Sequence, residues 1–330
     1  MPTFCRHNRF IERCPICSKT LPGNEPAGGS PRRAGTSGAK RAATGSRRGG
    51  TGLKVRREGR AAEDGYSHEL VPGLRASADA IRLAAEIDFA ATRLAALATD
   101  PPGLYGELRD MAAGDKERAT WGVLISAYLA PTEDPDPFAS IRAVLAEAPG
   151  PASLGGDIDG LLDEAEEGPR SSREPGRAKA TLLAYAQWVS RAGGGSQVAA
   201  FEGDGAWTSE RRFARLFERL ALPGFSRAGR YELLVTLGRL GLYEMQADSL
   251  QLGGTGEDPT TLAAKRVFGI GDPLLLDRRA GALAAAAEVP LEALDLALAN
   301  WAASERATAG FAGSAIEDGP ATEAASALGV

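Results

Sequence analysis

Alanine- and leucine-rich segments alternate with short polar loops from about residue 76 onward, and β-branched and aromatic residues are sparse among them. Alanine and leucine have high helix propensity, whereas strands favour the residue types that are rare here. The pattern therefore predicts an all-α fold. The predicted helices span residues 77–98, 119–129, 138–146, 177–192, 209–221, 227–240, 260–268, 278–287 and 291–303.

Several of these segments carry start signals. Thr208, Ser209 and Glu210 precede the segment RRFARLFERL, and Pro290 stands at the head of LEALDLALANW. A hydroxyl at the N-cap accepts a hydrogen bond from the first turn, and proline at the first helical position lacks only an N–H that has no helical partner. Residues 149–175 are acidic and rich in glycine and proline, which predicts a loop or an insertion within the helical domain.

Length and composition allow one large domain or two small ones. The chain has 330 residues, of which 43% are hydrophobic, so it can bury a substantial core. Its longest apolar runs are far shorter than the ~20 residues that span a bilayer. We therefore expect a cytoplasmic protein with no membrane association. We also expect a monomer.

Charge divides the chain more sharply than its net value of −5 indicates. Lysine and arginine exceed aspartate and glutamate by 15 − 6 = 9 in residues 1–75 and fall short by 37 − 23 = 14 in residues 76–330. A basic arm thus precedes an acidic body. We expect four parts: a zinc-binding segment (1–19), a disordered basic linker (20–75), a helical domain (76–310) and a disordered tail (311–330).

All three cysteines and one of the two histidines form the pattern CxHx6CxxC near the N-terminus. A CxxC pair delivers two thiolates to one tetrahedral ion, and a third thiolate and an imidazole complete a structural zinc site. Disulfides are not expected, because the number of cysteines is odd and nothing signals secretion. The alternative is three unrelated thiols, or a redox-active CxxC. The predicted zinc ligands are Cys5, His7, Cys14 and Cys17.

Residues 20–60 are mainly glycine, serine, proline, alanine and arginine. Such a segment buries too little apolar surface to offset the entropy of ordering it. Ten lysines and arginines and a single acid, Glu58, lie between Arg32 and Arg60. Flexible basic segments bind polyanions by counterion release, without reading sequence. We expect this linker to raise affinity for DNA, although a merely solubilising linker has the same composition.

The stretch LGGTGEDPTTLAAKRVFG, residues 252–269, places three glycines in four residues before a helical segment. Glycine tolerates positive φ and lets the backbone approach a ligand closely. Asp258 and Pro259 supply a cap and a first residue for the next helix, whose free N–H groups and positive dipole end attract a phosphate oxygen. An ordinary tight turn between helices is the alternative. The predicted phosphate-binding residues are Gly253, Gly254, Thr255 and Gly256.

This stretch resembles the helix-hairpin-helix signature of the endonuclease III and adenine-glycosylase superfamily, in which a hairpin reading LPGxG precedes a helix of small residues ending at a glycine. The similarity extends to WGVLISAYLAPTED, PGFSRAGRYELLVTLGRLG and LLLDRRAGALAAAA, and covers residues 119–138 and 209–301. Within the superfamily, RRFARLFERLALPGF and AAKRVFGIGDPLLLDRRA are most similar to the proposed α-glutamyl/putrescinyl thymine pyrophosphorylase group, whose members belong to DNA-modification systems.

The resemblance implies a function and a catalytic residue. It places the family's catalytic aspartate at Asp277, and it implies a monofunctional DNA N-glycosylase that flips a modified or damaged base, possibly a hypermodified thymine, out of the duplex. A carboxylate beside the sugar stabilises the positive charge that develops as the N-glycosidic bond breaks. The local sequence offers an alternative: Asp272 as N-cap and Pro273 at the first position make Asp277 a mid-helix residue paired with Arg278 or Arg279.

Three departures from the family pattern limit what it implies. The nucleophilic lysine of the family falls at Asp258, which cannot attack the sugar, so we expect no lyase step. No cysteine follows Cys17, so we expect no iron–sulfur cluster. In the family, a side chain of the early turn, often glutamine, fills the gap that a flipped base leaves in the duplex. The corresponding position here is near Pro131, so a different residue must fill that gap.

Other side chains are candidates by type. Basic residues near the hairpin could contact phosphates: Arg227, Arg230, Lys265, Arg266, Arg278 and Arg279. Aromatic residues could stack on a flipped base, although core packing is their more common role: Trp121, Tyr128, Trp188 and Trp207.

Two other functions fit the same sequence. One is a non-catalytic DNA-binding protein that keeps the hairpin as a phosphate clamp, and the other is an acidic helical scaffold for protein partners. Both the glycosylase and the non-catalytic DNA-binding protein would have DNA as their partner. Both would therefore be located at the nucleoid. Zinc is the cofactor that we expect.

Overall fold

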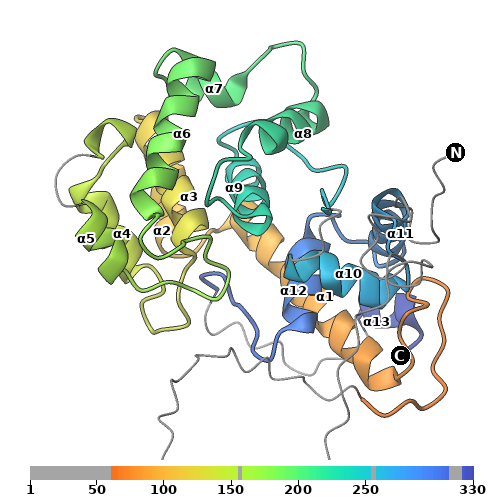
Figure 1. The fold of residues 1–330 in the computed structure, drawn as a ribbon. Helices are drawn as coiled ribbons and strands as arrows, with labels where there is room; N and C mark the ends of the chain where they lie inside the picture. The colour runs from red at the N-terminus through yellow and green to blue at the C-terminus, as the bar shows by residue number, and fades with distance from the viewer. Residues whose placement is uncertain (1–60, 155–157, 254–257, 312–321) are drawn as a thin grey trace, which may run out of the picture. The chain divides into compact units, whose positions relative to one another are not determined.

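The computed structural model describes residues 61–154, 158–253, 258–311 and 322–330, and the regular elements in these ranges are all helices (Figure 1). The prediction of an all-α fold is confirmed. None of these helices is both long enough and apolar enough to cross a membrane. The predicted zinc ligands Cys5, His7, Cys14 and Cys17 lie outside the described residues, as do Gly254, Thr255 and Gly256 of the hairpin.

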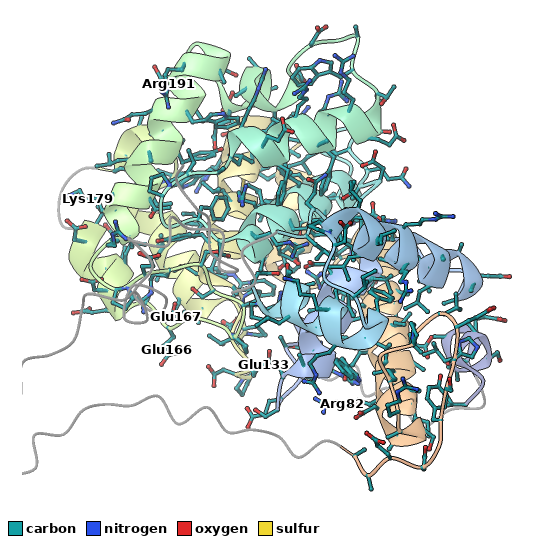
Figure 2. All side chains as sticks on the ribbon, turned by 45° about the vertical axis from the view of Figure 1, so that its right-hand side comes forward. Arg82, Glu133, Glu166, Glu167, Lys179 and Arg191 are labelled. Carbon is teal, nitrogen blue, oxygen red and sulfur yellow. The ribbon has the colours of Figure 1, made fainter. Side chains whose placement is uncertain are left out.

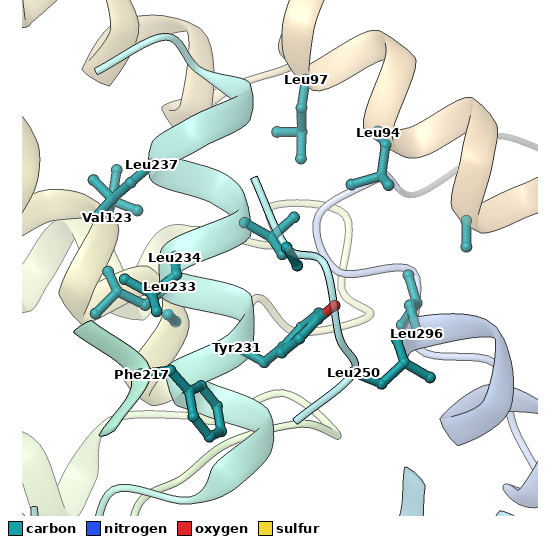
Figure 3. Close-up of a cluster of buried hydrophobic side chains, with 14 of the residues drawn as sticks. Leu94, Leu97, Val123, Phe217, Tyr231, Leu233, Leu234, Leu237, Leu250 and Leu296 are labelled. Atoms are coloured by element: carbon teal, nitrogen blue, oxygen red, sulfur yellow. The ribbon is translucent and has the colours of Figure 1, made fainter. Parts of the chain in front are cut away.

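Four helices form the centre of the helical unit: α1 (Ser77–Thr99), α3 (Lys116–Leu129), α9 (Arg227–Arg239) and α12 (Ala293–Ala302). Helix α1 packs along α12, and α9 packs against both α3 and α1. Figure 3 shows part of the core where they meet, with Leu97 of α1, Val123 of α3 and Leu234 of α9 fully buried. Burial of such side chains supplies the main favourable free energy of folding.

The other helices between α1 and α9 in the chain pack against α3, against α9 or against one another. They are α2 (Leu104–Met111), α4 (Ala139–Glu147), η3 (Pro151–Ser153), α5 (Ile158–Glu164), α6 (Ala178–Gly193), α7 (Gln197–Glu202) and α8 (Ser209–Arg219). The region 149–175, predicted as a loop or insertion, contains η3 and α5, both of which pack against α6. Ile158 and Leu162 of α5 are buried and give the short helix its apolar face.

Helices α10 (Pro259–Phe268) and α11 (Pro273–Ala286) start at aspartate-proline pairs. The Asp258 carboxylate accepts a hydrogen bond of 2.8 Å from the amide of Thr261, and Asp272 accepts one of 3.1 Å from the amide of Leu275. These contacts satisfy first-turn donors that have no helical partner. Helix α11 therefore begins five residues before the predicted start at residue 278.

The segment 61–76, which we call the N-terminal strap, packs against the helical unit. Val71 and Leu74 are buried in its core, and the Tyr66 hydroxyl donates to the carbonyl oxygen of Leu328 at 2.7 Å. The amide of Gly73 donates to the carbonyl of Val267 at 2.9 Å, in the last turn of α10. A Cβ at Gly73 would lie 1.8 Å from the Arg266 carbonyl oxygen, so only glycine fits there.

Both ends of the helical unit extend further than the sequence analysis expected. Residues 61–75 of the strap belong to the stretch predicted as a disordered linker, yet they pack against the helical unit. Residues 323–328 form α13 (Glu323–Leu328) within the stretch assigned to a disordered tail. Ala324 and Leu328 of this helix are fully buried, and α13 packs against α1. Their apolar side chains, although few, find partners that are distant in sequence.

Candidate active site

Asp277 lies in the second turn of α11, and it is half-buried. Its carboxylate accepts hydrogen bonds from the Ser249 hydroxyl at 2.9 Å and from the Leu250 amide at 3.1 Å. Burial raises its pKa above the ordinary value, even though these two hydrogen bonds lower it. The alternative suggested by the local sequence is right about the helix cap, but Asp277 accepts its hydrogen bonds from Ser249 and Leu250 rather than from Arg278 or Arg279.

Arg227, in the first turn of α9, also binds the segment around Leu250, through the carbonyl oxygens of its backbone. Its guanidinium donates to the carbonyl oxygens of Leu250 and Gln251, the latter at 3.2 Å. Leu250 thus gives its N–H to Asp277 and its C=O to Arg227. Together these two charged side chains fix the backbone immediately before Leu252 and Gly253, where the glycine stretch begins.

Asp295 of α12 is the most deeply buried acid of this region, with a side chain that is 3% exposed. Its two carboxylate oxygens bind Arg227 at 2.5 Å and Arg170 at 2.6 Å. Burial alone would raise the pKa of Asp295, but the two guanidinium charges outweigh burial and hold that pKa below its ordinary value. Asp258 adds a second acid 3.9 Å from Arg227. The cluster joins α9, α10, α12 and the loop before α6.

A cavity of about 510 Å³ lies beside this cluster. Its volume falls in the range of ligand pockets. Four parts of the chain form its wall: the loop at residues 169–171, the start of α9 at 226–228, the start of α10 at 258–260, and the end of α12 with the residues after it, at 299, 300, 303, 305 and 307. Among the described residues that line the cavity, Asp277 is absent.

The N-termini of two helices contribute residues to the wall of the cavity. At the start of α9, the Ser226 hydroxyl accepts from the amide of Gly229 at 3.0 Å, which leaves the amides of Arg227 and Ala228 without a described acceptor. Pro259 carries no N–H, and the amide of Thr260 has no described acceptor either. These free N–H groups and the positive ends of two helix dipoles favour an anionic group.

The other predicted phosphate contacts are spread over the unit. Arg278 is exposed, whereas Arg279 donates to the carbonyl oxygen of Phe268. Arg230 stacks on the ring of Phe217 at 4.3 Å, and Arg266 lies over the ring of Trp301 at 4.8 Å. The structure therefore brings Arg227 to the cavity wall but not these arginines.

The aromatic candidates do not line the cavity. Trp121, Tyr128 and Trp188 are buried in the core, where the Trp121 indole donates to the carbonyl of Ala148 at 2.6 Å. Trp207 lies under the guanidinium of Arg219, 5.0 Å from the ring centre. Core packing, the more common role, accounts for the first three.

Sequence reasoning missed Arg170 and Asp295. Arg170 falls in the stretch predicted as a loop or insertion, and Asp295 is the one charged residue of an otherwise largely apolar helix. A charged residue in an otherwise apolar helix signals a buried ion pair, because an unpaired buried charge is very costly. That signal identifies Asp295 from the sequence, but it does not identify its partners.

Comparison with known proteins adds one match. Residues 169–313 match the model of the family described as alpha-glutamyl/putrescinyl thymine pyrophosphorylase clade 3. No curated protein and no solved structure matches the chain. Every residue that lines the cavity lies within the matched range, and so does Asp277. The similarity therefore supports the narrower of the two resemblances seen in the sequence and links the chain to enzymes of thymine modification.

Proposed function

We propose that the protein is a DNA-modification enzyme that acts on a substituted thymine base, with pyrophosphate as a second reactant or as a product. The observation that carries the proposal is the cavity beside Arg170 and Arg227, at the N-termini of α9 and α10, within the region similar to the pyrophosphorylase family. Its volume of about 510 Å³ accommodates a base extruded from DNA together with a substituent.

The proposed reaction exchanges an amine and pyrophosphate on the substituent of the base. In one direction, the bond from carbon to the amine nitrogen forms as the bond from carbon to the pyrophosphate oxygen breaks, and the amine releases a proton. The reverse direction exchanges the same bonds. The chain's contribution is binding and orientation: the free amides at the start of α9 and α10 offer donors to the oxygens of a leaving or entering anion.

N-glycosidic cleavage is the second candidate reaction. The observation that favours it is the half-buried Asp277 carboxylate, whose raised pKa and contact with the segment before the hairpin suit a group that acts near DNA. Its two hydrogen bonds to Ser249 and Leu250 also suit a purely structural role, which is to fix the entry to the glycine stretch. Experiment must therefore separate these two roles.

The test uses the full chain and DNA that contains modified thymines, incubated with and without pyrophosphate. Nucleosides from the digested DNA are then analysed by mass spectrometry, and abasic sites are measured in parallel with an aldehyde-reactive probe. Loss or gain of a thymine substituent that depends on pyrophosphate or on an added amine supports the exchange reaction. Abasic sites made by the native chain but not by Asp277→Asn support the glycosylase.

A non-catalytic DNA-binding protein gives a third pattern. It would leave the nucleosides and the sugar backbone unchanged while binding DNA with a strong dependence on salt. That result, obtained with both the native chain and Asp277→Asn, would overturn both enzymatic proposals. Zinc remains a separate prediction, which metal analysis of the full chain tests: a zinc content well below one per chain would exclude the Cys5, His7, Cys14 and Cys17 site.

A further inference from the structure

We propose that α11 forms a symmetric contact with α11 of a second copy of this chain, in which Arg278 of each copy pairs with Glu288 of the other. The inference goes beyond the proposed function, because it assigns a partner to a surface that does not line the cavity. It differs from the monomer that we expect from the sequence.

The outward surface of α11 is apolar, which is unusual for a helix that meets solvent. Helix α11 packs against α10, α12 and α13, and Leu276 and Leu283 are fully buried. Figure 2 turns this edge of the helical unit, with α11 in blue, toward the viewer. The exposed positions of α11 carry five apolar side chains and one charge, and we call them the α11 face: Leu274, Leu275, Arg278, Ala282, Ala285 and Ala286.

The two leucines of the α11 face are strongly exposed. The side chain of Leu274 is 81% exposed, the highest value among the large hydrophobic residues that the structure describes, and Leu275 is 43% exposed. Helix α8 provides a contrast, because all of its exposed positions are charged: Arg211, Arg215, Glu218 and Arg219. A contiguous apolar surface is typical of a site that another molecule covers.

The composition of the α11 face indicates which kind of molecule covers it. Protein surfaces that bind DNA are polar and strongly positive, whereas this face has a single cation, Arg278. Alanine side chains along a helix allow a second helix to approach closely, and leucines supply apolar area to bury. The α11 face therefore fits a helix of a protein partner that also offers an acid to Arg278.

The chain itself offers that acid. Glu288 lies just after the end of α11, and both Glu288 and Arg278 are exposed, with no side-chain partner among the described residues. An acid at a helix C-terminus faces the negative end of the dipole, which is unfavourable. A cation from a second copy would offset this, so the two charges of α11 complement each other between copies.

The spacing along α11 agrees with a two-fold axis. In an antiparallel pair of identical helices, each contact occurs twice, once from each copy. Setting Arg278 opposite Glu288 of the second copy places the axis level with Leu283, and the same register sets Gly281 opposite Ala285 and Leu275 opposite Leu291. A Cβ built at Gly281 has no atom within 4 Å, so the centre of the pair is open to close approach. Leu291 is only partly buried and offers apolar surface to Leu275.

Sedimentation velocity of the full chain, freed of nucleic acid and measured over a series of concentrations, tests the proposal. We expect a reversible equilibrium between monomer and dimer, because one helix face is smaller than a permanent interface. Arg278→Glu and Glu288→Arg should each raise the Kd of the dimer about ten-fold, since two attractive pairs become repulsive. The combined variant Arg278→Glu with Glu288→Arg exchanges the two charges and should restore the native Kd.

Two charge reversals elsewhere are the matched controls. Arg211→Glu on α8 and Glu147→Arg at the end of α4 change exposed side chains that have no described partner, so both should dimerise like the native chain. Circular dichroism checks that every variant keeps its helices. A combined variant that dimerises no more tightly than the two single variants would overturn the pairing.

Three further outcomes would also overturn the inference. A native chain that stays monomeric over the whole concentration series has no such contact. A dimer that neither charge reversal weakens uses another surface. A monomeric chain whose DNA binding is lost in Arg278→Glu but kept in Arg211→Glu would assign the α11 face to DNA instead. None of these results depends on the assay of modified thymines, so the proposed function and the dimer can fail separately.

Discussion

Asp277 and Asp295 lie in the same C-terminal region, yet their surroundings shift the pKa values of the two carboxyl groups in opposite directions. Asp277 is half-buried and receives hydrogen bonds from two neutral donors, and burial raises its pKa. Asp295 is buried more deeply, but two arginines hold its pKa below the ordinary value. Burial thus favours the protonated acid only where no cation compensates the charge. The comparison separates a carboxyl whose protonated form is favoured by burial from one whose charged form is favoured by two arginines.

The substitution with the largest expected effect on this contrast is Asp295→Asn. The variant leaves Arg170 and Arg227 buried without their common partner, so we expect a loss of about 3–5 kcal/mol in the free energy of unfolding. Urea denaturation followed by circular dichroism measures it. Asp134→Asn, at an exposed site, should stay within about 0.5 kcal/mol of the native chain. A similarly small change for Asp295→Asn would show that the ion cluster does not stabilise the fold.

Arg170→Met should cost less, about 1–3 kcal/mol, because Asp295 keeps its bond to Arg227. The double variant Arg170→Met with Asp295→Asn sharpens the test. Removing the arginine from the chain that already lacks the acid relieves one unpaired charge, so the two losses should not add. Strict additivity of the two free energies in the same urea assay would contradict direct coupling between these side chains.

Ser249→Ala probes the other acid. It removes the hydroxyl that donates to Asp277 at 2.9 Å, and we expect a loss of about 1 kcal/mol in the free energy of unfolding. It should also raise the pKa of Asp277 further, because this hydrogen bond favours the charged form. NMR titration of the carboxyl carbon reports that pKa. An unchanged or lowered value would show that the hydroxyl does not stabilise the carboxylate.

The smallest effect concerns the pH dependence of stability. The folded pKa of Asp277 lies above its unfolded value of about 3.9, so its contribution to stability is greatest below that pH and declines as the pH rises through the folded pKa. For Asp295, with a lowered pKa, the contribution is present above about 3.9 and declines as the pH falls. Urea midpoints measured at successive pH values should show this decline with rising pH in the native chain. Asp277→Asn should lack the part of the decline that comes from Asp277. Identical profiles for native and variant chains would reject it.

The periodic helices were predictable because their signals are local. Helix α9 begins at Arg227 as predicted, where the Ser226 hydroxyl caps the first turn, and α8 begins at Ser209 behind the Thr208 cap. Helix α11 is the exception, because Asp272 caps it and Pro273 is its first residue, five positions before the predicted start at residue 278. Local cap chemistry was the better guide to that boundary.

The candidate site was predictable only in part. The glycine stretch and Arg227 indicated the region, but the cavity also requires Arg170 and the chain after α12, which are more than 50 residues away from Arg227 on either side. A sequence shows that a charge stands in an apolar helix, as Asp295 does, but not which arginines reach it. Those pairings depend on helix packing across the whole unit.

The strap has a consequence for the order of events during synthesis. Gly73 completes the last turn of α10 by donating to Val267, which is 267 − 73 = 194 positions later in the chain. A segment made early therefore stays without its hydrogen-bond acceptor until most of the polypeptide has left the ribosome. Contacts of such long range form late and slow the search for the native state. We expect residues 61–76 to acquire protection from proteases only as the final step of folding.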